Sequence, residues 1–235
     1  MLKTRYNLSV RKSGLFATPW PYIWVWIFLA IIVLGLANPT NLILTVIKVG
    51  GILLCFAYTI ITFPRDRWLQ LALGVTFLAD IILAINNTAE AGVLLFLCAQ
   101  LIHLIRLEGK RVRSCIIVFC TLLLLILGTN FAWQFAPMMY PICGFYLIVL
   151  FTNIICSIFW RRREPQNLVA LFAVLGFCLF LCCDICTGLS YLSLNNFLPA
   201  FVYAPANYFA WFFYYPSQIL LSNSSKCVKI SPKRR

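Results

Sequence analysis

The sequence predicts an all-α integral membrane protein: a single bundle of about eight transmembrane helices with both termini in the cytoplasm. Composition gives the first reason, because the 235 residues are 63% hydrophobic and only 11% charged, with a mean hydropathy of +0.93. A soluble domain of this length cannot bury so much apolar surface. The second reason is that the apolar residues are gathered into stretches of membrane-spanning length, and the third is the placement of positive charge between them.

Eight apolar stretches are long enough to cross the hydrocarbon core, for which a helix needs about 20 residues. The first stretch continues directly into the multi-span pattern, so we expect it to remain as a helix rather than to act as a cleaved signal peptide. The chain then divides into a basic cytoplasmic leader, 1–19, the transmembrane domain, 20–222, and a basic cytoplasmic tail, 223–235. The expected spans are 20–38, 41–63, 68–86, 89–107, 112–129, 134–160, 167–192 and 200–222.

The net charge of +13 comes from basic residues that all fall on one side of an eight-span bundle. The turns on the other side contain no Lys or Arg. This pattern follows the positive-inside rule, places both termini in the cytoplasm and supports the span count. Topology and attraction to anionic membrane lipids explain the charge, so no nucleic-acid partner is expected. The basic residues are Lys3, Arg5, Arg11, Lys12, Arg65, Arg67, Arg106, Lys110, Arg111, Arg113, Arg161, Arg162, Arg163, Lys226, Lys229, Lys233, Arg234 and Arg235.

The chain contains eleven cysteines, of which Cys183 and Cys186 have the C-x-x-C spacing. Inside a membrane helix a cysteine acts as a small apolar residue that allows close packing. No second cysteine pair and no histidine cluster completes a metal site in the sequence. We therefore expect structural cysteines, no metal and no cofactor.

Four ionisable residues remain inside the expected spans: Lys48, Asp80, His103 and Asp184. A charge at the bilayer centre costs roughly 2.5–3.5 kcal/mol, so such residues usually face the bundle interior and have a function. At 1.5 Å per residue, Lys48, Asp80 and Asp184 all lie roughly 9–12 Å below the outer surface. His103 lies near the cytoplasmic end of its span, where we expect an interfacial side chain. A shared depth for the other three predicts one polar cluster.

Polar side chains share a helix face with each of these three charges, as expected for the walls of a polar cavity. A Lys–Asp ion pair that only fixes helix packing is the alternative, but it accounts for a single Asp. The strings F-L-A-D-I-I-L and F-L-C-C-D-I-C around Asp80 and Asp184 also suggest a weak 4+4 parallel repeat. The companions are Asn41 and Thr45 with Lys48, Thr76 and Asn87 with Asp80, Thr187 and Tyr191 with Asp184, and Asn207, Trp211, Tyr214 and Gln218 on the eighth span.

Five short motifs occur in a fixed order along about residues 40–222: Lys48, Ala79-Asp80, Ala99-Gln100, Cys183-Asp184 and Tyr215-Pro216-Ser217-Gln218. Their order and the number of spans resemble the YhhN family of eight-helix membrane proteins, whose characterised animal members are lysoplasmalogenases. The family pattern has Lys-Pro where this chain has Lys48-Val49, Gly for Ala79, His for Gln100 and Ser for Cys183. Both aspartates are intact, whereas these changes put the exact substrate in doubt.

The resemblance implies hydrolysis of the vinyl ether bond of a lysoplasmalogen, which gives a fatty aldehyde and a glycerophospho-headgroup. Protonation of a vinyl ether carbon leaves an oxocarbenium ion, so the reaction needs a proton donor and an anion, as in glycoside hydrolysis. A desolvated carboxyl beside a second one tends to keep its proton, and the two titrate as a unit. We prefer Asp184 as general acid and Asp80, paired with Lys48, as the stabiliser of the cation.

The same resemblance makes a lysophospholipid the expected partner. In an alternative role, Lys48 binds the phosphate of this lipid. The aromatic run 208–215 could line a pocket for its acyl chain or its headgroup. The expected catalytic pair is Asp80 and Asp184. The expected substrate-binding set is Lys48, Thr76, Thr187, Asn207, Trp211, Tyr214, Tyr215 and Gln218.

Two other classes of function remain open. Intramembrane charges also suit a proton-coupled transporter or a lipid-binding or lipid-sensing protein without catalysis. Transporters usually break their helices at the site, and Gly50-Gly51 beside Lys48 fits such a break, whereas no Pro lies near either Asp. A serine esterase is not expected because G-x-S-x-G is absent, and H-E-x-x-H is absent as well. The membrane is the plasma membrane if the chain is bacterial and an internal one otherwise.

Overall fold

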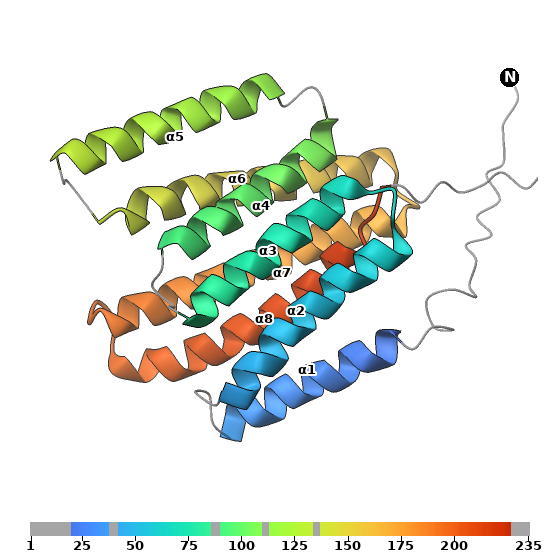
Figure 1. The fold of residues 1–235 in the computed structure, drawn as a ribbon, viewed down its shortest axis with the longest axis horizontal. Coiled ribbons are helices and arrows are strands. Elements are labelled where there is room, and N and C mark those ends of the chain that lie inside the picture. Colours follow the sequence, from blue (N-terminus) through green and yellow to red (C-terminus); the bar gives the residue numbers. More distant parts are fainter. Residues whose placement is uncertain (1–19, 38–41, 86–89, 110–112, 134–136, 227–235) are drawn as a thin grey trace, which may run out of the picture.

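The computed structural model describes residues 20–37, 42–85, 90–109, 113–133 and 137–226, and these residues are almost entirely helical. They form eight α-helices and one short 3-10 helix, with no strand among them (Figure 1). The expected leader 1–19 lies outside the described residues, as do Asn38, Asn41, Asn87 and the tail beyond Lys226.

Each α-helix coincides with one of the eight expected spans, with ends that differ by a few residues. Five of them, α2, α3, α4, α6 and α7, are long and apolar enough to cross a membrane, so the chain is a multi-pass membrane protein. The 3-10 helix Ala200–Val202 leads into α8. The α-helices are α1 Trp20–Ala37, α2 Leu42–Thr62, α3 Arg67–Ile85, α4 Glu90–Glu108, α5 Arg113–Trp133, α6 Met139–Arg163, α7 Leu168–Leu194 and α8 Tyr203–Ser222.

Side chains just before α3 and α7 fix where these helices begin. The Asp66 carboxylate accepts a hydrogen bond from the Leu69 amide at 3.1 Å, and the Asn167 side chain accepts one from the Val169 amide at 2.9 Å. Each side chain satisfies a backbone donor that has no partner inside its helix. In contrast, Gly50 and Gly51 lie within the continuous helix α2, so the helix break that a transporter site usually shows is not present there.

Most consecutive helices pack against each other, as in any up-and-down bundle, so the 4+4 repeat that the paired Asp strings suggest stays a prediction. The contacts α1–α2, α2–α3 and α3–α4 correspond to α5–α6, α6–α7 and α7–α8, and the cross contact α2–α8 corresponds to α4–α6. The correspondence ends at the edge: α1 packs on α8 as well as α2, whereas α5 lies at the far side of the bundle along α6 (Figure 1). The two halves therefore meet through α2, α4, α6 and α8.

Close backbone approach holds α8 against its neighbours. A Cβ added to Gly176 of α7 would lie 2.8 Å from Cγ and 3.2 Å from the backbone nitrogen of Leu221. A Cβ added to Gly51 of α2 would lie 2.6 Å from the Tyr215 ring. Glycine at these two positions lets α8 sit deep between α7 and α2, as small residues do in membrane helix packing.

Polar contacts join the ends of α3, α4, α6 and α8 at one end of the bundle. Asp66 accepts hydrogen bonds from the Ser225 hydroxyl at 2.9 Å and the Lys226 amide at 3.2 Å. Arg106 donates to the Ser224 carbonyl and hydroxyl, both at 2.7 Å, and the Lys226 ammonium lies over the Trp160 ring. The predicted basic turns thus gather at one end, and residues 223–225, expected in the tail, are buried in the bundle.

Candidate functional site

Asp80 lies in the middle of the bundle, on the face of α3 that is turned towards α8. Its side chain is 6% exposed, and its Oδ2 accepts a hydrogen bond of 2.7 Å from the Tyr214 hydroxyl. No other side chain in the described part of the structure donates to this carboxyl. This hydrogen bond joins the polar face predicted for the third span to the one predicted for the eighth.

Asp184 has an equivalent partner on α6, a helix on which we expected no site residue. The Tyr146 hydroxyl of α6 donates to Asp184 Oδ2 at 2.6 Å. Tyr146 is buried, whereas Asp184 is only partly buried. Sequence reasoning missed Tyr146, although Tyr146, Asn153 and Ser157 follow the spacing i, i+7, i+11 that marks one helix face.

The two carboxyl groups are connected through their tyrosines. The Tyr214 and Tyr146 hydroxyls lie within electrostatic range of each other, so the groups run in the order Asp80, Tyr214, Tyr146, Asp184. The Cys183 thiol lies within electrostatic range of both carboxyls. The two Asp–Tyr pairs therefore lie in one region of the bundle, and two phenol groups separate the aspartates.

Gln100, which stands where the resembled family has His, belongs to the same region. Its backbone carbonyl and its side-chain oxygen both accept hydrogen bonds of 2.9 Å from the Asn153 amide nitrogen. Both residues are almost completely buried. The Gln100 side chain also lies beside the Tyr146 hydroxyl, so α4 and α6 together hold the phenol that contacts Asp184.

Lys48 does not form the ion pair with Asp80 that we expected. Within the described residues no carboxylate oxygen lies within 4.0 Å of its ammonium, which instead lies 4.5 Å from the centre of the Trp211 ring. Trp211 in turn meets Tyr214 edge-on at 5.2 Å between ring centres. The side chain extends towards α8 rather than towards α3, and a cation–π contact takes the place of the ion pair.

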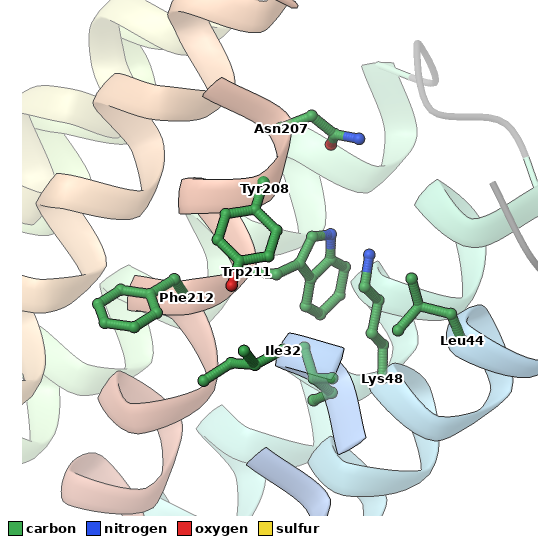
Figure 2. Close-up of a pocket in the computed structure, with 8 residues that line it drawn as sticks. Ile32, Leu44, Lys48, Asn207, Tyr208, Trp211 and Phe212 are labelled. Atoms are coloured by element: carbon green, nitrogen blue, oxygen red, sulfur yellow. The ribbon is translucent and has the colours of Figure 1, made fainter. Parts of the chain in front are cut away.

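Figure 2 shows the narrow pocket into which Lys48 extends. The ammonium and the Trp211 ring lie side by side, and the Asn207 amide lies at the end of the pocket to which the ammonium points. The enclosed space is about 10 Å³, the room of a single water. The lining comes from α1, α2 and α8: Ile31, Ile32, Leu44, Lys48, Asn207, Tyr208, Trp211 and Phe212.

The remaining predicted binding residues are distributed differently. Thr76 is buried on α3 one turn before Asp80, whereas Thr187 is exposed and donates to the Cys183 carbonyl at 3.0 Å. Tyr215 and Gln218 have no exposed surface; the Tyr215 ring fills the space above Gly51. The structure thus places Thr76, Asn207, Trp211 and Tyr214 on the helix turns nearest to the charges. Among the described residues, neither the Tyr215 hydroxyl nor the Gln218 side-chain oxygen has a hydrogen-bond partner.

His103 is not interfacial, contrary to our expectation. Its side chain is 2% exposed, and its ring meets Phe177 of α7 edge-on at 5.3 Å. Its Nδ1 has no hydrogen-bond partner among the described residues. The expectation failed because position along the span, one turn before Arg106, says nothing about which face of α4 a side chain occupies.

No group of three His, Cys, Asp or Glu side chains that could hold a metal ion occurs in the ranges that the structure describes. The described side chains of the site are two carboxyls, two phenols and one ammonium, which are groups that can hold or transfer a proton. These features define a multi-pass helical membrane protein with an intramembrane carboxyl pair.

The sequence profile of the YhhN family matches residues 43–225, which include Lys48 and both aspartates. The chain belongs to the YhhN family. No curated protein and no solved structure matches it.

Proposed function

We propose that this protein is a lysoplasmalogenase-like hydrolase that cleaves the vinyl ether bond of lysoplasmalogens. The observation that supports this proposal most is the pair of carboxyl groups, each in contact with one tyrosine hydroxyl, inside a membrane domain. The family is associated with this reaction, and its substrate resides in the bilayer. The assay described below tests whether the carboxyl pair of this chain carries out that reaction.

The proposed reaction consumes one water. A carboxylic acid transfers its proton to the vinyl carbon farther from the ether oxygen, and the double-bond electrons form the new C–H bond. Positive charge develops on the carbon next to oxygen, where the second carboxylate stabilises it. Water adds to that carbon and returns a proton to the first carboxylate. The hemiacetal hydroxyl then loses its proton as the bond to the glycerol oxygen breaks, and the glycerol oxygen takes up one proton. A fatty aldehyde and a glycerophospho-headgroup leave.

Asp184 is our choice for the general acid and Asp80 for the stabilising carboxylate. Asp184 is partly exposed as a residue whereas Asp80 is buried, and protein atoms surround the carboxyl groups of both. Each tyrosine contacts Oδ2 only, which leaves Oδ1 of each carboxyl for substrate or water. The phenols hold the two carboxyls in fixed orientations, as a preorganised site requires.

The experiment is aldehyde release from a 1-alkenyl lysophospholipid by the purified protein, with choline and ethanolamine headgroups tested in parallel. Asp80→Asn and Asp184→Asn keep the size of each side chain but remove its acid–base chemistry. Glu90→Gln, at the start of α4, is the matched control. We expect release by the native protein and by the control, and loss of release in both Asp variants at unchanged thermal stability. A native protein that releases no aldehyde from either substrate contradicts the proposal.

We further propose that the basic end of the bundle faces the cytoplasm, as the positive-inside rule requires. The carboxyl pair then lies in the outer half of the bilayer. An epitope tag added after Arg235 should resist external protease in intact cells and be cleaved after the membrane is permeabilised. Cleavage in intact cells contradicts this orientation.

A further inference from the structure

Lys48 is a buried cation with no carboxylate beside it in the part of the chain that the structure describes. Its side chain is 9% exposed, and its ammonium contacts only the Trp211 ring, at 4.5 Å, among the described residues. A charged side chain inside the membrane is normally paired with another charge or serves a ligand pathway. A cation–π contact alone leaves most of the hydrogen-bonding capacity of the ammonium unused, since its three donors need acceptors.

The pocket around Lys48 fits the oxygen of an anionic head group better than it fits a hydrocarbon chain. Its polar lining residues are Lys48, Asn207 and Tyr208, and the other five are apolar or aromatic. The space beside the ammonium has room for one water-sized group, which is enough for one phosphate oxygen but not for a whole phosphate or an alkyl chain. The Asn207 amide lies at the open end towards which the ammonium points and supplies a second donor (Figure 2).

This pocket lies next to the carboxyl pair but is separate from it. Trp211 separates the ammonium from Tyr214, whose hydroxyl contacts Asp80 at 2.7 Å. Trp211 and Tyr214 are three residues apart, about 4.5 Å along the helix axis. A ligand whose anionic group contacts Lys48 therefore has to extend past the Trp211 and Tyr214 rings to bring another group beside Asp80. In a lysoplasmalogen, the phosphate and the vinyl ether are joined by the three carbons of glycerol, a separation of this order.

We infer that the pocket of Lys48, Asn207 and Trp211 is the phosphate-binding site for the headgroup of a single-chain glycerophospholipid. The inference rests on the proposed function, because it assigns this pocket to the headgroup end of the lysoplasmalogen substrate. Phosphate at Lys48 fixes the position of the lipid along the bilayer normal and so sets the vinyl ether at the level of Asp80 and Asp184. Recognition then depends on the phosphate and only weakly on the group attached beyond it.

Binding of uncleavable ligands tests this inference without using activity. The full-length purified protein is titrated with a 1-alkyl lysophospholipid, with a 1-alkylglycerol that lacks the phosphate, and with soluble glycerol phosphate that lacks the chain. We expect the phosphate to tighten binding of the lipid by about tenfold or more, as charge-assisted hydrogen bonds do. Glycerol phosphate alone should bind at least about a hundredfold more weakly than the alkyl lysophospholipid, because no apolar surface is buried.

The variant Lys48→Met keeps the length of the side chain and removes its charge. We expect it to abolish the preference for the phosphate-bearing lipid while its affinity for 1-alkylglycerol stays within about twofold of native. Asn207→Leu should reduce the preference in part, and it gives an independent answer if Lys48→Met does not fold. Arg162→Met removes one charge from an exposed position at the basic end and should leave the preference unchanged.

Two results overturn the inference: a native protein that binds both lipids equally, or a preference that survives both Lys48→Met and Asn207→Leu. If glycerol phosphate binds as tightly as the lipid and this binding depends on Lys48, the pocket is a site for free phosphate, and the inference is overturned as well. Lys48-dependent binding without aldehyde release contradicts the proposed function alone. Aldehyde release that shows no dependence on Lys48 contradicts the headgroup site alone.

Discussion

The tyrosine that contacts Asp184 provides a sharp test of how the carboxyl pair works. Tyr146→Phe removes one hydroxyl and leaves the buried ring in place. In the structure that hydroxyl donates to Asp184 at 2.6 Å, and no other side chain of the described residues donates to this carboxyl. A hydrogen bond to a charged group contributes about 1.5–3 kcal/mol. If the bond acts in the transition state, kcat should fall roughly ten- to hundredfold, since 1.36 kcal/mol corresponds to a factor of ten.

The assay is steady-state aldehyde release with kcat and KM determined separately. A positioning role predicts that kcat falls while KM stays near its native value, because the phenol contacts the carboxyl and not the lipid. Tyr140→Phe is the matched control, since Tyr140 lies on the same helix and is 44% exposed. Native kcat in Tyr146→Phe, together with loss of activity in Asp184→Asn, refutes the reasoning. An equal loss in Tyr140→Phe refutes it as well.

Three other predictions concern the site and its frame. Tyr214→Phe should lower kcat by a similar factor through Asp80, and a native pH–rate profile in this variant contradicts that role. Asp66→Ala removes the α3 cap and the acceptor of the buried Ser225 hydroxyl, so we expect it to destabilise the protein by about 2–4 kcal/mol in detergent unfolding. Gly176→Ala should destabilise by about 1–3 kcal/mol because its Cβ would overlap Leu221, whereas Gly144→Ala, with nothing within 4 Å, should be neutral or stabilising by up to about 1 kcal/mol. Equal stability of the two Gly variants contradicts the close α7–α8 contact.

The helix positions could be predicted because hydropathy and loop charge report directly on the membrane. The spans around Asp80 and Asp184 were placed to within a few residues, and the basic turns gather at one end as expected. Depth follows from residue number at 1.5 Å per residue, which is why the shared level of Lys48 and the two aspartates was visible in the sequence.

Contacts between side chains could be predicted less well than helix positions. The depth of a residue in the membrane does not determine which face of its helix it occupies or which rotamer its side chain adopts. Lys48 turns towards Trp211 rather than Asp80, since its long side chain can reach either α8 or α3 from the same backbone position. Tyr146 gave no signal because a neutral tyrosine in an apolar helix resembles any other aromatic residue. Only its spacing from Asn153 and Ser157 marks the face, and burial of all three confirms it.

Hydrolysis in heavy water is the measurement that tests the central claim most directly. If a protein carboxyl protonates the vinyl carbon, aldehyde formed in D₂O and trapped at once carries one deuterium on the carbon next to the carbonyl, as mass spectrometry will show. Asp80→Asn and Asp184→Asn should yield neither labelled nor unlabelled aldehyde. Aldehyde without deuterium, or labelled aldehyde formed at the native rate by both Asp variants, contradicts the assignment of proton transfer to this carboxyl pair.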